Sequence, residues 1–251
     1  CKWLRAGVIE EGRRVAATKG TPQGAVISPL LANIYLHYVM DLRVRQWRQR
    51  HAHGEMIAVR YADDSVVGFR TQWLARRFLE QLQKRLAKFG LSLNASKTRL
   101  IEFGRFAVFN RRKRGRGKPE TFDFLGFTHC CDTTRSGEFQ VLRLTVKKRM
   151  RATLQGIRIA LSRRRHECVQ VVGRWLGSVV RGYFNYHAVP GNLCRLDGFR
   201  VAVCRLWRQA LKRRSQRNRL QWSRYGRLAN LYIPRVRTAH PYPEERFASR
   251  T

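Results

Sequence analysis

Two adjacent carboxylates, Asp63 and Asp64, are the residues whose types and spacing most clearly could do chemistry in this sequence. They stand between two short apolar stretches, residues 56–61 and 65–69, in which β-branched or aromatic side chains alternate with other residues. This alternation predicts two strands joined by a turn that carries both aspartates. Carboxylate oxygens are preferred Mg²⁺ ligands, and paired Mg²⁺ ions activate a hydroxyl and stabilise the leaving group in phosphoryl transfer. Taken alone, the pair also fits an ordinary solvated turn, because aspartate favours turns.

Helices on both sides of this predicted hairpin must hold it in place. Between residues 27 and 42 apolar side chains recur at helical spacing, which predicts a helix with one buried face. Ser28 followed by Pro29 predicts its start, with Ser28 as the N-cap residue and Pro29 in the first turn. Residues 72–90 predict a second amphipathic helix, which Gly90 ends.

The sequence changes character near residue 145. The elements expected before it are a short strand over 99–103, a charged glycine-containing loop over 111–118 and a hairpin over 122–127. The helical and strongly basic segments expected after it are about 147–165, 168–187 and 195–217. We expect the polar and aromatic tail, residues 218–251, to be irregular. The predicted fold class is therefore α+β, with a helical second part.

The net charge is the strongest compositional signal. The chain has 52 Lys and Arg against 16 Asp and Glu, which gives a formal net charge of +36. Hydrophobic residues make up 43% of the chain, which is enough for a folded core. In a folded protein this many positive charges repel one another strongly, which indicates a polyanionic partner. No apolar run approaches the roughly 20 residues of a bilayer crossing, so we expect no membrane partner. The six cysteines form no Cys-x-x-Cys pair, which favours reduced thiols and an intracellular protein.

Four sequence blocks, in order along the chain, resemble those of one enzyme family. Tyr61-Ala62-Asp63-Asp64 resembles the Tyr-x-Asp-Asp box of reverse transcriptases. Upstream, Gly20-Thr21-Pro22-Gln23-Gly24 and the Ser28-Pro29-Leu30-Leu31 stretch resemble the preceding block of the group II intron enzymes. Lys97-Thr98 and the stretch from Phe122 to Phe127 resemble the next two blocks. The sequence is thus similar to bacterial group II intron-encoded reverse transcriptases and maturases.

This resemblance implies roles for particular residues. Asp63 and Asp64 would be catalytic and would bind Mg²⁺ as the cofactor. Gln23, Gly24 and Tyr61 would line the nucleotide and template pocket. Lys97 would reach phosphate as a point charge. The stretch from Phe122 to Phe127 would grip the primer.

The C-terminal part resembles the thumb and maturase segment of the same family. The similar stretches are Arg181 to His187, Arg213 to Gln216 and His240 to Phe247. Arginines interleaved with aromatic residues can pair with phosphates and stack on unpaired bases. The RNA-binding residues that we expect here are Arg163, Arg164, Arg165, Arg213, Arg214 and Tyr183. For any single aromatic residue, packing in a helix core is the ordinary alternative.

The resemblance implies a partial reverse-transcriptase palm over residues 1–145 and a thumb and maturase region over residues 146–251. The expected function is RNA-directed DNA synthesis for a group II intron, with binding of the intron RNA to assist splicing and mobility. The expected partners are intron RNA, an RNA template, a DNA primer and dNTPs, in a bacterial cytoplasm. The first palm aspartate of the family lies upstream of Gly20, where residues 1–19 offer only Glu10 and Glu11 as acids. We therefore interpret the chain as an N-terminally truncated fragment and expect little or no DNA synthesis from it alone.

Two other functions stay open from the sequence. A non-catalytic splicing maturase would use the basic helices to hold intron RNA without polymerising DNA. The intact Tyr-Ala-Asp-Asp box disfavours this function, whereas the missing upstream aspartate favours it. A reverse transcriptase of another retroelement or of a defence system is disfavoured by the maturase-like C-terminal segment.

Overall fold

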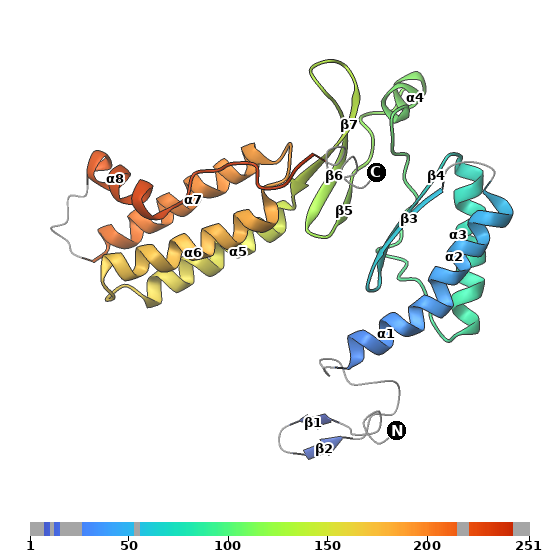
Figure 1. The fold of residues 1–251 in the computed structure, drawn as a ribbon, viewed down its shortest axis with the longest axis horizontal. Helices are drawn as coiled ribbons and strands as arrows, with labels where there is room; N and C mark the ends of the chain where they lie inside the picture. Colours follow the sequence, from blue (N-terminus) through green and yellow to red (C-terminus); the bar gives the residue numbers. More distant parts are fainter. Residues whose placement is uncertain (1–7, 11–12, 16–26, 53–55, 215–220, 243–251) are drawn as a thin grey trace. The chain divides into compact units, whose positions relative to one another are not determined.

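The computed structural model describes residues 8–10, 13–15, 27–52, 56–214 and 221–242. The chain divides into two compact units, Cys1–Leu100 and Ile101–Thr251 (Figure 1). Both units combine helices with small antiparallel sheets, which confirms the α+β fold class. The boundary near residue 145, which separates the expected palm from the expected thumb and maturase region, lies inside the second unit and stays a prediction.

The first unit begins with a two-stranded hairpin and a long helical stretch. β1 (Val8–Glu10) pairs antiparallel with β2 (Arg13–Val15). The helical stretch consists of α1 (Ser28–Leu36), the π-helical segment η2 (His37–Asp41) and α2 (Leu42–His51). Pro29 lies in the first turn of α1, as predicted. Ile27 occupies the N-cap position, so Ser28 is the first helical residue and not the cap.

The predicted hairpin and the helix after it are both confirmed. β3 (Met56–Tyr61) pairs antiparallel with β4 (Asp64–Phe69), and α3 (Gln72–Lys88) follows. Thr71 caps α3, because its hydroxyl accepts a hydrogen bond from the Leu74 backbone N–H at 3.4 Å. The hairpin and the helices share one core, whose buried residues are Val39, Met40, Val44, Trp47, Met56, Phe78, Leu82 and Leu86. This core fixes the hairpin against the helices of its own unit.

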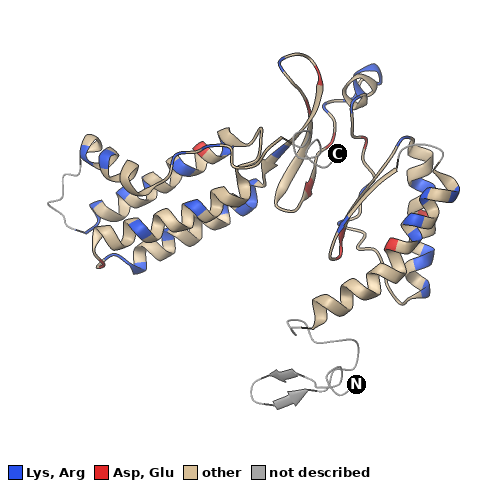
Figure 2. Cartoon of the chain, in the orientation of Figure 1, with Lys and Arg blue, Asp and Glu red and all other residues tan. Residues whose placement is uncertain are grey.

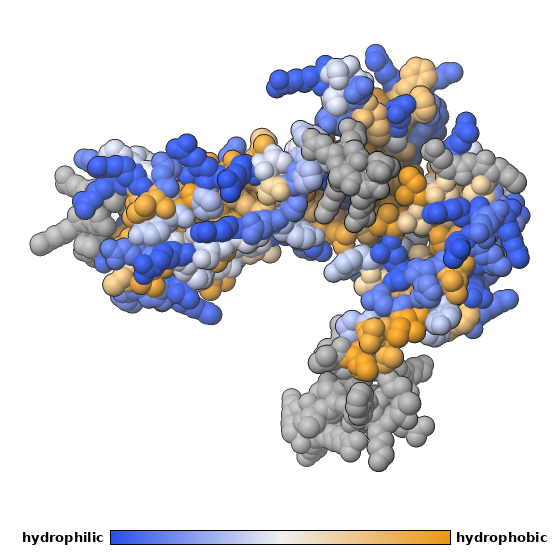
Figure 3. Space-filling view, viewed as in Figure 1, coloured by the Kyte–Doolittle hydropathy of each residue, from blue (hydrophilic) through white to orange (hydrophobic). Residues whose placement is uncertain are grey.

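The apolar face of α1 is not part of that core, so the prediction of a buried face is wrong for this helix. Leu30, Ile34 and Tyr35 are 59%, 48% and 44% exposed, and no residue of α1, all of which is described, is buried. Figure 3 shows the resulting apolar surface on α1. Burial begins at Val39, inside η2, where the helical stretch enters the core that it shares with the hairpin and α3.

The second unit contains a three-stranded antiparallel sheet in the order β5-β6-β7. Its strands are β5 (Phe122–Phe124), β6 (Phe127–Thr133) and β7 (Phe139–Thr145), which confirms the hairpin expected over 122–127. The strand expected over 99–103 is wrong. Phe103 contacts the sheet through its side chain and not through a backbone ladder, since its ring centroid lies 5.1 Å from that of Phe122. The short helix α4 (Ala107–Lys113) follows, and the sequence pattern does not predict it. The loop expected over 111–118 is therefore wrong over residues 111–113, which are helical, and begins at residue 114.

Helices form the rest of the described part of the second unit. They are α5 (Lys147–Arg163), α6 (Val169–His187), α7 (Leu193–Lys212) and α8 (Trp222–Tyr232). The first three follow the expected helical ranges. The irregular tail is wrong over α8, because Tyr225 is 2% exposed and donates its hydroxyl to the Cys204 carbonyl oxygen at 2.6 Å. Over the described residues, we find no helix with the length and apolar character that a membrane crossing requires.

A buried polar cluster joins β7 to the junction between α6 and α7. The Asn192 side chain accepts a hydrogen bond from the Thr145 N–H at 3.0 Å. It donates to Thr145 Oγ1 at 2.7 Å and to the His187 carbonyl oxygen at 2.8 Å. Asn192 is 0% exposed and Thr145 is 2% exposed. Burial, followed by the nearby charge of Arg149, lowers the pKa of His187 to about 4, so this imidazole is neutral at pH 7.

Candidate active site

The two aspartates lie at the tip of the β3–β4 hairpin. The strands pair from Met56 opposite Phe69 to Tyr61 opposite Asp64, which leaves Ala62 and Asp63 as a two-residue turn. Asp63 is therefore in the turn, whereas Asp64 is the first residue of β4. Ala62 has a φ of 51°, in the left-handed region, which costs a residue other than glycine roughly 1–2 kcal/mol. Such a turn persists because its surroundings hold it.

The alternation of β3 decides which side chains meet solvent. Met56 is buried at 6% exposure, whereas Ile57 and Tyr61 are each 64% exposed. Residues directly opposite each other in an antiparallel pair share a face, so Asp64 lies on the exposed face beside Tyr61. Asp63 and Asp64 are both exposed, and among the described residues neither has an ion-pair partner. Both carboxylates are therefore accessible from solvent.

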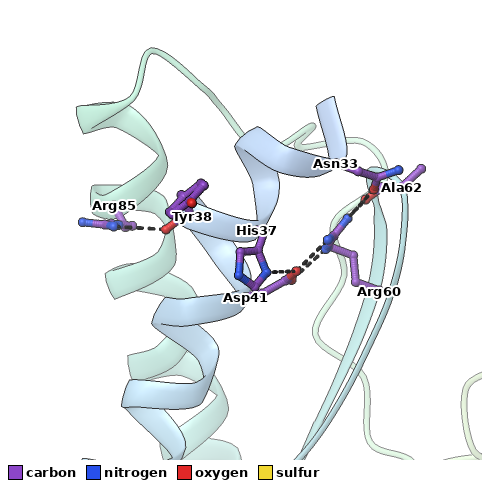
Figure 4. Close-up of polar contacts among 7 residues, drawn as sticks. All are labelled: Asn33, His37, Tyr38, Asp41, Arg60, Ala62 and Arg85. Atoms are coloured by element: carbon purple, nitrogen blue, oxygen red, sulfur yellow. Dashed lines mark hydrogen bonds and ion pairs between the residues drawn. The ribbon is translucent and has the colours of Figure 1, made fainter. Parts of the chain in front are cut away.

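Arg60 connects this turn to the helices (Figure 4). Its Nε and Nη2 atoms donate to the two carboxylate oxygens of Asp41, in η2, at 2.7 and 2.6 Å. Its Nη1 atom donates to Asn33 Oδ1, in α1, at 2.9 Å and to the carbonyl oxygen of Ala62 at 2.8 Å. One guanidinium thus ties the turn that carries Asp63 to the α1–η2 stretch.

The Arg60–Asp41 pair is charged and shielded in part from water. Hydrogen bonds from Arg60 lower the pKa of Asp41, and the hydrogen bonds to Asp41 raise the pKa of Arg60. The side chains are 17% and 34% exposed, respectively. His37 Nδ1 lies 3.4 Å from Asp41 Oδ2 as a further neighbour. Two parallel hydrogen bonds between a guanidinium and a carboxylate fix the orientation of the arginine side chain as well as its distance from the acid. Arg60 is therefore held in place where it contacts Ala62, the first residue of the turn.

Asp63 and Asp64 suit a Mg²⁺ ion in chemical type, since hard cations prefer carboxylate oxygens. Across the described ranges, however, three or more His, Cys, Asp or Glu side chains nowhere come together as a metal site. The two aspartates therefore supply part of a ligand set, and a complete set requires at least one further oxygen ligand.

The other expected substrate-binding residues are placed in part. Lys97 is exposed, in a turn that Asn94 shapes by accepting hydrogen bonds from the Ser96 N–H and hydroxyl at 3.0 and 2.7 Å. The exposed position is consistent with a lysine that reaches phosphate. Gln23 and Gly24 lie outside the described residues.

The β5–β6 hairpin of the second unit has a tight turn at Leu125 and Gly126, whose φ angles are 48° and 82°. The Tyr186 hydroxyl, from α6, donates to the Leu125 carbonyl oxygen at 2.7 Å. The Tyr186 ring also stacks with that of Phe127, with centroids 5.7 Å apart. A helix residue therefore holds the turn of the segment that resembles the primer-gripping block.

The expected RNA-binding arginines divide into two groups. Arg163 and Arg213 are exposed. Arg164 pairs with Glu167 at 3.0 Å and lies over the Trp175 ring at 4.8 Å. Arg214 donates to the backbone carbonyl oxygens of Arg165, at 2.7 Å, and of Glu167. Arg214 thus closes the loop between α5 and α6, and its guanidinium is already engaged.

Tyr183 is packed and does not present a free ring to solvent. It is half-buried, and its ring stacks on that of Phe199 with centroids 3.8 Å apart. Burial raises the pKa of its hydroxyl to about 12. For Tyr183 the structure therefore favours the core alternative over base stacking.

The sequence interpretation overlooks Arg60, Asp41 and Asn33. Strand alternation offers a signal, because Arg60 shares its face with Met56 and Ala58, which point toward the core. A charged residue at an inward-facing strand position requires a partner. That partner is more than fifteen residues upstream, in a helix, and the sequence does not identify it.

Comparisons with known proteins agree with the motif analysis. Residues 2–129 match the family model described as "Reverse transcriptase (RNA-dependent DNA polymerase)". The group II intron-encoded protein LtrA of Lactococcus lactis subsp. cremoris is 29% identical over 119 residues. This alignment covers 42% of the present chain and 19% of LtrA.

A second relative comes from a eukaryote. The uncharacterized 91 kDa protein in the cob intron of Schizosaccharomyces pombe is 23% identical over 267 aligned residues. The alignment covers 76% of the present chain and 30% of that protein. The chain thus spans less than a third of the length of either relative.

Proposed function

Because this chain belongs to the reverse transcriptase (RNA-dependent DNA polymerase) family, we propose that it carries the aspartate pair of a group II intron polymerase together with an RNA-binding region. The reaction would be the RNA-templated addition of deoxynucleotides from dNTPs to a DNA primer. Binding of the intron RNA would couple this reaction to splicing and mobility. We further propose a bacterial cytoplasmic protein that is associated with nucleic acid, on the basis of its similarity to LtrA.

The single observation that carries the proposal is the geometry of the β3–β4 turn. Two exposed carboxylates lie at the end of a hairpin whose base is buried in a helical core. The strained residue Ala62 is held by Arg60, which is itself held by Asp41 and Asn33. A solvated surface turn needs no such support, whereas a site that must place oxygen ligands accurately does.

Mg²⁺ bound by Asp63 and Asp64 would supply activation of the primer 3′-hydroxyl and neutralisation of the triphosphate. The chain's own residues set the positions of these carboxylates. Tyr61, on the same exposed face as Asp64, would contact the incoming nucleotide or template. Gln23, Gly24 and Lys97 complete the proposed substrate contacts.

The RNA-binding part of the proposal rests on the helices of the second unit. Figure 2 shows Lys and Arg along α5, α6 and α7. Exposed cations such as Arg163 and Arg213 gain affinity by releasing counterions from phosphates, so binding would weaken steeply as salt rises. The other three expected arginines would contribute less to RNA binding. Arg164 and Arg214 already have partners within the protein, and Arg165 is half-buried.

A non-catalytic maturase is the second candidate. The observation that favours it is that, among the described residues, only two carboxylates are available at the proposed metal site. Under this alternative the basic helices hold intron RNA, and Asp63 has no role in binding.

Primer extension on a poly(rA)–oligo(dT) template tests the proposed function. The purified chain should give little product, because a two-ion mechanism needs a ligand that Asp63 and Asp64 do not provide. A longer product of the same gene that supplies an upstream aspartate should be active. In that longer protein Asp63→Asn should lower the rate by about 10³-fold, as expected for loss of a group that stabilises transition-state charge.

Glu80→Gln is the matched control, because it removes an exposed carboxylate from α3 in the same unit and should leave the rate unchanged. Full activity in the Asp63→Asn protein would refute the catalytic role. No DNA synthesis by any longer product, together with tight binding of intron RNA, would favour the maturase alternative.

A further inference from the structure

The short helix α4 exposes two aromatic rings that the proposed polymerase site does not use. Phe106, at its N-cap, and Phe109, in its first turn, are 68% and 66% exposed. Residues three apart lie on the same side of a helix, so the two rings share one face. Ala107 between them is 3% exposed and anchors the helix from below. Large rings left in water at adjacent positions indicate a partner.

The backbone under these rings is fixed to the sheet of its own unit. The Gly104 N–H donates to Cys131 Sγ, in β6, at 3.3 Å. Phe103 packs on Phe122 of β5. The segment that carries Phe106 and Phe109 is therefore a preformed surface and not a free loop.

The acids of this region are already paired. Arg111 donates to the Gly117 carbonyl oxygen at 3.0 Å and lies 3.7 Å from Glu120. Arg114 donates to the Asn110 carbonyl oxygen at 3.0 Å, and its guanidinium holds Glu102 at 2.5 Å. The bond from Arg111 to Gly117 folds the segment 114–118 back on the end of α4.

Further cations lie on α4 and in the segments on either side of it. They are exposed and pair with no described acid: Arg105, Arg112, Lys113, Arg116 and Lys118. Figure 2 shows Lys and Arg on α4, and Figure 3 shows apolar atoms among hydrophilic ones there. The surface thus combines flat apolar rings with uncompensated positive charge.

We propose that α4 and the segment after it, residues 114–118, bind an unpaired segment of RNA, with bases stacked on Phe106 and Phe109 and phosphates held by the neighbouring cations. This inference deepens the proposed function and rests on it. Charge complementarity selects a polyanion, and the rings select one with open bases, because a duplex keeps its bases stacked inside.

The test measures binding of the whole chain to a fluorescein-labelled 12-nucleotide RNA, its duplex and the DNA strand of the same sequence, by anisotropy. Phe106→Leu together with Phe109→Leu keeps the apolar character and removes the rings. We expect affinity for the single-stranded RNA to fall by about tenfold or more, on the basis of the usual effect of base–aromatic stacking. Affinity for the duplex should change by less than about twofold, because the phosphate contacts remain.

Val141→Ala, on β7 of the same unit and 42% exposed, is the matched control and should bind all three probes as the unmodified chain does. Photocrosslinking of the unmodified chain to RNA that contains 5-iodouridine should attach the RNA to the peptide with Phe106 and Phe109. This readout does not depend on whether the double variant folds. Wild-type affinity in the double variant, equal losses on strand and duplex, or a loss confined to DNA would overturn the inference. Failure of the unmodified chain to bind any RNA would instead overturn the proposed function from which the inference starts.

Discussion

The Arg60–Asp41 pair gives the sharpest quantitative prediction. Asp41→Asn removes the charge at nearly constant size, and Arg60→Gln removes the guanidinium and shortens the side chain. Two hydrogen bonds to a charged group would contribute about 1.5–3 kcal/mol each if they were fully buried. The carboxylate of Asp41 is 34% exposed, so water recovers more than half of that value when the pair is broken. We expect a coupling free energy of about 2 kcal/mol between the two positions.

Native-state hydrogen exchange in the peptide 56–69 measures this coupling, because it reports on the hairpin alone and not on the second unit. The four proteins needed are the unmodified chain, each single variant and the double variant. Arg45→Gln is the control, since Arg45 is exposed on α2 and its loss should change protection by less than about 0.5 kcal/mol.

The coupling should also depend on pH in a defined direction. The pKa of Asp41 is lowered below its ordinary value of 3.8 by the hydrogen bonds from Arg60. Its contribution is therefore fully present above pH 3.8 and is lost as the pH falls through the lower pKa of the folded state. A coupling below about 0.5 kcal/mol at pH 7 would show that Arg60 does not hold the turn.

Three further results are expected in the second unit, each measured by urea unfolding. Gly177→Ala should destabilise this unit by about 1–3 kcal/mol, because a Cβ would lie 2.5 Å from a backbone carbonyl oxygen at the end of α8. Gly182→Ala is the matched control in the same helix: a Cβ there has no atom within 4 Å, so this variant should stabilise the unit by up to about 1 kcal/mol. Asn192→Ala should cost roughly 3 kcal/mol, because three buried hydrogen bonds are lost; a cost under about 1 kcal/mol would contradict the cluster. Stability should fall by roughly 2–3 kcal/mol as the pH drops from 6.5 to 4, since His187 protonates in the unfolded chain first, and His187→Gln should remove this dependence.

The sequence predicts the elements whose pattern is local. The alternation around Asp63 and the stripe over 72–90 are confirmed as β3–β4 and α3, because one buried face determines each. The helix α8 escapes prediction because Tyr225 is buried by α7, a contact that periodicity within the tail does not reveal. The helix α1 shows the reverse case. Its apolar residues recur at helical spacing and so predict a buried face, but no described residue buries that face.

The site is predictable in its carboxylates and not in its support. Asp63 and Asp64 stand out by type and position, whereas Arg60 becomes meaningful only when Asp41 and Asn33 are brought to it by the packing of helix on hairpin. The roles of Arg214 and Tyr183 could not be read from composition either. A basic or aromatic residue in a helix can bind RNA only if its side chain is not already bound by a neighbouring loop or helix. Arg214 is bound by the loop between α5 and α6, and Tyr183 is packed on Phe199.

The two-residue turn between β3 and β4 also bears on how this gene can vary. The strands pair one to one as far as Tyr61 and Asp64, so a codon gained or lost between them would shift the register by one residue. Every side chain of one strand would then exchange faces, so either Asp64, in β4, would turn toward the helices or Arg60, in β3, would turn away from Asp41. Selection should therefore act on the length of this segment more strictly than on the identity of a residue such as Ser65. In a collection of intron-encoded genes that retain mobility, single-codon insertions and deletions should be absent from this hairpin even where substitutions are frequent.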